Sequence, residues 1–330
     1  MQAQNPVLPR WELQPTPTKV SLRGLCAVSA QVCWATGSKG TVLRTTDGGQ
    51  TWEKIYLADS DSGELRDVEA FSAQEALVMQ AGEGRQSRVF RTLDGGQTWQ
   101  TVFQHPGPGG FLDGMAFWNH RQGLMAGDPM QGRIEIWLTE DKGQTWQALP
   151  AKQAPPVQEG EFSFAASGTH LCTQAPSKAW VSTGGQVARI FYTSDGGQTW
   201  QASPVPLLQG KDSQGVFSVS FINLTYGLAA GGDYDTPGEE GPTLAYSRNG
   251  GKTWKTRKAP QVGFRSCIRY RPETKEVICV GQGGSSISFD RGRTWFNFGQ
   301  EGFHTLSIAP DGSSVWAAGT GGRIALLREK

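Results

Sequence analysis

An eight-residue pattern occurs six times along this 330-residue chain, and no other feature limits its fold so strongly. Four copies are close variants of Thr-x-Asp-Gly-Gly-Gln-Thr-Trp, and the last two copies are looser. The Trp residues that end successive copies are 47, 47, 54, 54 and 41 positions apart. Repetition at this spacing indicates a fold built from similar supersecondary units. The copies occupy residues 45–52, 92–99, 139–146, 193–200, 247–254 and 288–295.

Each copy has the composition of a tight turn between two strands. An Asp or Asn side chain can accept hydrogen bonds from backbone N–H groups two residues on, and the second Gly, such as Gly49, can adopt the positive φ that a hairpin needs. We expect the final Trp to fill the space between neighbouring units. A calcium loop of the EF-hand type would need oxygens at alternate positions and a Glu at position 12, so we expect no metal. The structural turn residues are Asp47, Asp94, Asp141, Asp195, Asn249 and Asp290.

The residues around each copy alternate between apolar and polar, which is typical of strands, and no segment has a convincing helical period. In the first unit this alternation predicts strands over residues 22–28, 32–36, 42–45 and 52–57. Four short strands in a unit of about 40–50 residues indicate a blade of a β-propeller. The sequence therefore predicts an all-β fold.

The two ends of the chain complete the blade count. Residues 303–309, 315–319 and 323–327 supply three strands of a last unit that has no fourth strand of its own. The N-terminal segment Arg10-Trp11-Glu12-Leu13 resembles a fourth strand, and joining it to the last unit would close the ring and remove exposed edges. We therefore expect one seven-bladed domain over residues 1–330. The expected blades are about 21–57, 64–103, 111–149, 160–204, 216–258, 263–299, and 303–328 with 10–15.

One face of this ring gathers polar residues. The repeated turns join third and fourth strands, so the first strands of all blades must start at the opposite face, around the central channel. Several of these starts carry charge, and loops between second and third strands add more. Arg323, at the start of a third strand, lies near the same face. The candidate ligand-binding residues at the channel mouth are Arg23, Arg66, Asp113, Asp128, Ser167, Asp233, Arg265 and His304.

Such a mouth suits an acidic ligand, because guanidinium groups form bidentate hydrogen bonds with planar anions. The alternative is that the Arg and Asp side chains pair with each other as a structural network in a wet channel. The expected ligand is an acidic small molecule, a glycan or an acidic segment of a protein. The interpretation as a structural network without a ligand stays open at this point.

Composition excludes several other classes. Lys and Arg total 31 against 30 for Asp and Glu, and a net charge of +1 argues against nucleic acid as a partner. No run of about 18 apolar residues occurs, so we expect no membrane span. Gly-rich stretches such as 82–84 and 319–322 do not open a helix after a strand, so we expect no dinucleotide or other cofactor. We expect a monomer.

The five Cys residues leave two interpretations open. An odd number without a Cys-x-x-Cys motif argues against a zinc site. Cys26 with Cys33, and Cys267 with Cys279, each flank one short turn and could pair across strands. Buried free thiols are the alternative. Cys172 has no such neighbour.

The repeat is identified as the Asp-box, or BNR, repeat, and the whole chain resembles the photosystem II stability/assembly factor-like family. The resemblance rests on stretches that cluster at the predicted channel mouth. It implies a binding propeller, since photosynthetic members bind a nascent membrane-protein partner, and it implies export to the periplasm or outside the cell, with any signal peptide absent from this sequence. The stretches are 116–118, 127–129, 164–169, 217–219, 231–234, 263–267 and 302–304.

Relatives in this family are often labelled oxidoreductase or glycosyl hydrolase. Nothing in the residues supports a nicotinamide-dependent oxidoreductase. Asp-box propellers include sialidases, which use three Arg residues for a substrate carboxylate, and Arg23, Arg66 and Arg265 with Asp113 could play these roles. The chain lacks the sialidase N-terminal motif, and its one Tyr candidate, Tyr234, lies in a loop. We therefore assign no catalytic residue and expect a non-catalytic binding protein, with an exported sialidase-like hydrolase as the alternative.

Overall fold

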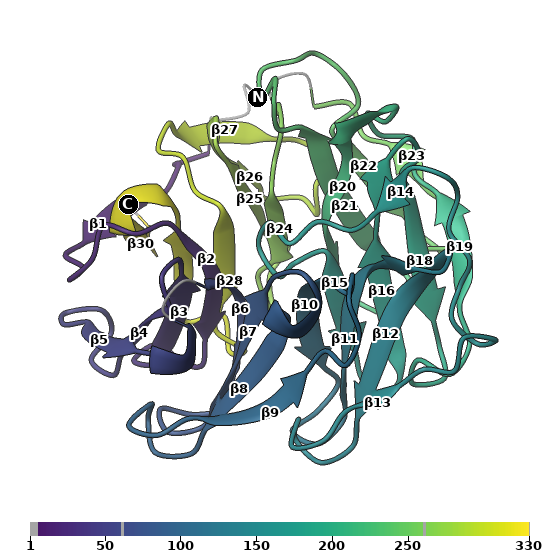
Figure 1. Cartoon of the computed structure of the whole chain (residues 1–330). Helices are drawn as coiled ribbons and strands as arrows, with labels where there is room; N and C mark the ends of the chain where they lie inside the picture. The colour runs from purple at the N-terminus through teal and green to yellow at the C-terminus, as the bar shows by residue number, and fades with distance from the viewer. Residues whose placement is uncertain (1–5, 61–62, 260–261, 330) are drawn as a thin grey trace.

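The computed structural model describes residues 6–60, 63–259 and 262–329, so the expected domain limits at residues 1 and 330 lie outside the described part. Seven antiparallel sheets surround a central axis, and the described residues contain only three short 3-10 turns besides strands (Figure 1). The predicted seven-bladed, all-β propeller is confirmed. None of the helical turns in the described part has the length or apolarity to cross a bilayer.

The first three blades each consist of four consecutive strands. Blade 1 contains β2 (Leu22–Ala27), β3 (Cys33–Gly37), β4 (Thr41–Thr45) and β5 (Glu53–Tyr56). Blade 2 contains β6 (Glu64–Ala70), β7 (Ala76–Ala81), β8 (Arg88–Thr92) and β9 (Gln100–Gln104), with η1 (Ala58–Ser60) before it and η2 (Gly84–Gln86) within it. Blade 3 contains β10 (Leu112–Phe117), β11 (Gly123–Met130), β12 (Arg133–Thr139) and β13 (Gln147–Ala148).

The fourth and fifth blades are less regular, because two short strands of the blade 4 region join the sheet of blade 5. Blade 4 contains β15 (Leu171–Gln174), β16 (Lys178–Ser182), β18 (Arg189–Thr193) and β19 (Gln201–Pro204). Blade 5 contains β20 (Lys211–Phe221), β21 (Gly227–Asp233), β22 (Leu244–Ser247) and β23 (Lys255–Thr256), and β14 (Glu161–Phe162) and β17 (Gly184–Gly185) extend it beyond β20.

The ring closes between the two ends of the chain. Blade 6 contains β24 (Cys267–Tyr270), β25 (Val277–Gly281), β26 (Gly284–Ser288) and β27 (Phe296–Gly299). Blade 7 contains β28 (Thr305–Ile308), β29 (Val315–Ala318) and β30 (Ile324–Arg328), with η3 (Thr320–Gly322) before β30 and the N-terminal β1 (Arg10–Gln14) as its outer strand. β1 lies antiparallel to β30, with Arg10 opposite Arg328 and Gln14 opposite Ile324 (Figure 1). The predicted closure by the N-terminal strand is confirmed.

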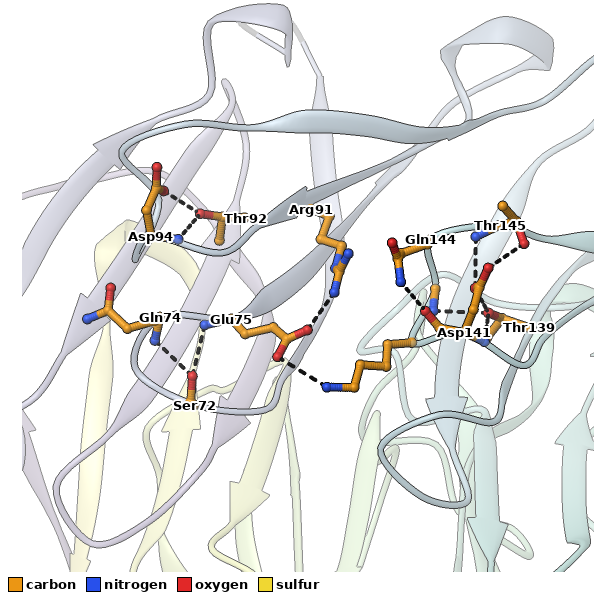
Figure 2. A network of polar contacts seen from close by, with 12 residues as sticks. Ser72, Gln74, Glu75, Arg91, Thr92, Asp94, Thr139, Asp141, Gln144 and Thr145 are labelled. Carbon is orange, nitrogen blue, oxygen red and sulfur yellow. Dashed lines mark hydrogen bonds and ion pairs between the residues drawn. The ribbon is translucent and has the colours of Figure 1, made fainter.

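The Asp-box turns share one hydrogen-bond pattern, and Figure 2 shows its Thr–Asp contacts in blades 2 and 3. In blade 2, the Thr92 hydroxyl donates to Asp94 Oδ1 (2.9 Å) and accepts from the Gly96 backbone N–H (2.8 Å). Asp94 Oδ1 also accepts from the Thr98 N–H at 2.9 Å, four residues on rather than the expected two. The turn is longer than expected because both of its Gly residues, Gly95 and Gly96, have positive φ.

The box Trp residues pack against the preceding blade, as predicted. Trp99 belongs to a core cluster with Ile55 of blade 1, and Trp146 packs in a cluster with Leu77 of blade 2. Each of these indole N–H groups also donates to a carbonyl of its own turn, as Trp99 does to Gly96 at 3.1 Å. Glu75 adds a polar link between blades 2 and 3, because its carboxylate lies 2.7 Å from the Arg91 guanidinium and 3.9 Å from the Lys142 ammonium (Figure 2).

All five Cys residues are free thiols in the structure. The strand register explains why the two cross-strand pairs do not form. Cys26 lies opposite Trp34 while Cys33 lies opposite Ala27, so their side chains point to opposite faces of the sheet and enter different core clusters. Cys267 and Cys279 are separated in the same way, since they lie opposite Val280 and Ile268.

We expect replacement of Thr92 by Val to lower the free energy of unfolding by about 1–3 kcal/mol, because the isosteric side chain leaves the buried Gly96 N–H without an acceptor. Thr92 is only 1% exposed, so water cannot replace the hydroxyl. Urea unfolding followed by Trp fluorescence measures the change. Thr98→Val on the exposed side of the same turn is the control, and equal losses for both variants would contradict the assigned role of Thr92.

Candidate ligand-binding site at the channel mouth

A segment of blade 4 crosses the channel at the face opposite the Asp-boxes. We call residues 163–169 the plug. Its backbone carbonyls accept hydrogen bonds from side chains of distant blades: Arg23 Nη1 of blade 1 donates to Ala166 O at 3.3 Å, and Arg66 Nη1 of blade 2 donates to Ala165 O at 2.9 Å. Because these blades lie across the axis from blade 4, the plug closes the middle of the channel.

Further contacts hold the plug in place from the remaining side of the ring. The Ser167 hydroxyl donates to Ser266 O of blade 6 at 2.9 Å, and the Thr305 hydroxyl of blade 7 donates to Ser167 O at 3.2 Å. The alignment of blades predicts that the first strand of blade 4 starts at Ser167, but β15 begins only at Leu171. The residues before it leave the blade because their hydrogen bonds go to other blades.

Four cationic or ionisable side chains gather beside the plug, and we call Arg23, Arg66, His304 and Arg323 the cationic cluster. Burial and the neighbouring Arg66 lower the pKa of Arg23 to about 10. Burial and the charges of Arg23, Arg66 and Arg323 lower the pKa of His304 to about 4, so this imidazole is neutral at pH 7. These shifts show that Arg23 and Arg66 lie close enough to repel each other and that all three guanidinium groups act on His304.

Little negative charge balances this cluster. Glu64 lies 3.5 Å from Arg66 and is the carboxylate that raises the pKa of Arg23. Asp113 is 1% exposed, and neither of its oxygens has a hydrogen bond of regular geometry. Burial and the nearby Asp128 raise the pKa of Asp113 well above its usual value, although Arg66 opposes this. Burial thus disfavours the charged form of Asp113, which would otherwise offset the guanidinium charges.

Asp128 lies at the edge of this region. Its Oδ1 accepts a hydrogen bond from the backbone N–H of Ser163, the first residue of the plug, at 3.1 Å. Burial raises the pKa of Asp128 to about 6, while the Ser163 hydrogen bond opposes the shift. Asp128 therefore anchors the plug to blade 3.

The remaining sequence-predicted residues point elsewhere. Ser167 is buried and bonded to Thr169 and Ser266. Asp233 accepts from Gln214 Nε2 (3.1 Å) and the Asp235 N–H (2.9 Å). Burial raises the pKa of Asp233, but its hydrogen bonds, including one from Ser213, lower the pKa by more than burial raises it. The pKa of Asp233 is therefore below its usual value.

Arg265 is 3% exposed and bonds within blade 6, donating to Phe264 O at 2.9 Å and to Ser286 Oγ at 3.0 Å. It lines a separate pocket of about 790 Å³ between the loops of blades 5 and 6. The structure thus groups Arg23, Arg66, Asp113 and His304, and it places Asp233 and Arg265 in other surroundings. From the sequence, Arg323 was named only as lying near this face. Glu64 and the plug carbonyls were not predicted, because no repeated pattern marks them.

The sequence matches two family models. The model described as photosynthesis system II assembly factor YCF48 matches residues 3–163, and the model of the BNR/Asp-box repeat matches residues 191–202 and 245–256. No curated protein sequence matches the chain significantly.

Solved structures agree with these matches. The chain is similar to a structure titled "YCF48 bound to D1 peptide", with 20% identity, 99% of each chain covered and a TM-score of 0.68. It is also similar to YCF48 from Cyanidioschyzon merolae, with 17% identity, 96% of this chain and 98% of the other covered and a TM-score of 0.69. The chain is a BNR-repeat propeller that matches the photosystem II assembly factor-like family. A structure of U3-55K shares the fold alone, at 10% identity and a TM-score of 0.66 over 96% of this chain and 98% of that one.

The geometry of this propeller does not favour the sialidase alternative. A sialidase site needs three guanidinium groups that converge on one carboxylate. Arg23 and Arg66 lie together, but the Arg265 guanidinium bonds within blade 6 and faces another pocket. Tyr234 is 40% exposed and packs edge-on against Phe217 rather than beside Asp113.

Proposed function

We propose that this propeller is a non-catalytic binding protein that holds an acidic segment of a partner protein at the plugged mouth of its channel. The observation that carries the proposal is the charge imbalance of the cationic cluster. Arg23 and Arg66 lie close enough to repel each other, and Arg323 adds a third guanidinium group that acts on His304. Glu64 is the one carboxylate bonded to the cluster among the described residues. A carboxylate from outside would relieve this repulsion and bind with bidentate geometry.

A peptide is a more fitting ligand than a small glycan for two reasons. The plug fills the axis at this face, so the cationic cluster surrounds a closed surface instead of a deep pocket. The similar YCF48 structure is titled as bound to D1 peptide, which gives a precedent in the same fold for a protein segment as ligand. We also propose that the protein acts outside the cytoplasm, as the family resemblance implies, and that it binds as a monomer.

Fluorescence anisotropy with labelled hexaglutamate, at fixed low salt, tests the proposal. Arg66→Gln should weaken binding at least about tenfold, and Arg23→Gln with Arg66→Gln more than about a hundredfold, because truncation of a charge partner typically costs 2–5 kcal/mol. Arg293→Gln, which changes the net charge equally in an exposed Asp-box turn, is the matched control and should bind like the parent.

Two results would overturn the proposal. Equal affinity of the Arg66 and Arg293 variants would mean that the peptide binds through general charge attraction. Release of 4-methylumbelliferone from a sialoside, lost in Asp113→Asn, would establish the hydrolase alternative. Labelled hexaglutamine serves as the uncharged reference peptide and should not bind.

A further inference from the structure

A chamber of about 500 Å³ lies in the channel on the other side of the plug. Residues of the inner strands of all seven blades line it, and Ser167, Gly168 and Thr169 of the plug close its inner end. The ends of these strands, such as Val28 and Phe71, form its rim, so it opens on the Asp-box face. The chamber is therefore a blind pocket, separate from the cationic cluster.

Side chains of opposite charge line this chamber without forming ion pairs with one another. Asp67 and Glu69 of β6 lie on the blade 2 side, and Arg269 of β24 lies on the blade 6 side. None of the three forms an ion pair with any residue in the described part of the chain. Arg269 makes one long hydrogen bond, from Nη1 to Val219 O at 3.4 Å. All three side chains line the chamber.

No ion pair neutralises the acidic wall in the described part of the chain. Burial raises the pKa of Asp67 and, together with the Asp67 charge, that of Glu69, while Arg269 lowers both from a distance. Asp67 accepts hydrogen bonds from the N–H groups of Met115 (2.8 Å) and Val68 (2.9 Å), which orient its carboxyl group. An ammonium group beside these carboxyl groups would stabilise their charged forms, because an opposite charge in a partly buried site is weakly screened.

Three hydroxyl groups that line the chamber are already hydrogen-bonded. The Ser307 hydroxyl accepts from the Ala27 N–H at 3.0 Å, the Ser220 hydroxyl accepts from the Tyr270 N–H at 3.3 Å, and the Thr173 hydroxyl donates to Phe117 O at 2.8 Å. The charged groups therefore have more capacity left for a ligand than these hydroxyl groups have. Unpaired buried charge is costly, and a ligand carrying both signs would offset it on both walls.

We propose that this chamber binds a small zwitterion, with its ammonium group at Asp67 and Glu69 and its carboxylate at Arg269. The volume lies within the range of small-molecule sites. The two walls come from blades three positions apart in the seven-membered ring, so the ligand spans the channel and contacts both. A separation of charges along the ligand is thus required, and either charge alone is insufficient.

Titration calorimetry with glycine, 4-aminobutyrate and 6-aminohexanoate tests the chamber, with hexylamine and hexanoate as probes that each keep one charge. At least one amino acid should bind at least about tenfold more tightly than both singly charged probes. Glu69→Gln and Arg269→Gln should each weaken that binding at least about tenfold, and Glu140→Gln and Arg293→Gln, exposed in Asp-box turns of the same face, should not.

The outcome is independent of the acidic-peptide proposal, because the two sites lie on opposite sides of the plug. Thermal unfolding of each variant identifies any that fails to fold, and the variant on the other wall then carries the test. No heat with any amino acid, or equal binding of hexylamine and 6-aminohexanoate, would overturn the zwitterion site. We also expect Glu69→Gln to leave hexaglutamate binding unchanged.

Discussion

A chain that lacks residues 1–15 should lose at least about 4 kcal/mol of unfolding free energy, because the ring can no longer close. The lost strand β1 pairs with β30 along five residues and covers the outer edge of blade 7. Trp11 also packs against Phe298 and Phe303, at ring distances of 5.7 and 5.2 Å, and donates to Ser285 Oγ of blade 6 at 2.8 Å. Deletion exposes both this apolar surface and the backbone of β30.

Urea unfolding followed by circular dichroism measures the loss of unfolding free energy. Glu12→Gln is the control, because it removes only the exposed ion pair with Arg328 and should change stability by less than about 1 kcal/mol. A deleted chain that unfolds within about 1 kcal/mol of the parent would show that β1 does not hold the ring together.

Replacement of Gly168 by Ala should destabilise the protein by about 2–5 kcal/mol, because two separate costs add. Gly168 has a φ of +68°, which an L side chain adopts at a cost of about 1–2 kcal/mol. A Cβ atom at this position would also lie 2.2 Å from Asp67 Oδ1, and this carboxyl group is held by two backbone N–H groups. The side chain and the plug cannot both keep their places.

Gly196 supplies a matched control for the backbone cost alone. It has a φ of +74° in an Asp-box turn, and a Cβ atom there would meet nothing within 4 Å. Gly196→Ala should therefore cost only about 1–2 kcal/mol. Chemical denaturation of both variants measures the difference, and similar losses would contradict close packing of the plug against Asp67.

Local chemistry was enough to predict most of the fold. The Asp-box residues form their turn through contacts within a few positions, as Thr92, Asp94 and Gly96 do. Each turn can therefore be recognised in the sequence. The period-two alternation marks strands for the same reason. Even the closure by Trp11 was predictable, because the segment repeats the sequence pattern of a fourth strand and the last unit lacks one.

The candidate site was predicted only in part. Arg23, Arg66 and His304 were found because they occupy equivalent positions in three blades, and the structure places them together. Arg265 occupies the equivalent position in blade 6, yet its guanidinium bonds to Phe264 and Ser286 instead. Equivalent backbone positions do not determine where a long side chain points, because its neighbours differ from blade to blade.

The sequence by itself therefore determined the repeating unit, the blade number and the closing strand, all of which depend on short-range patterns. Only the tertiary structure decided the plug, the charge imbalance beside it and the chamber behind it. The plug has no strand periodicity, and its hydrogen-bond partners, such as Arg66 and Thr305, lie about 100 and 140 positions away. Such contacts form because the ring brings distant blades to one axis, and that arrangement exists only once all seven blades are packed.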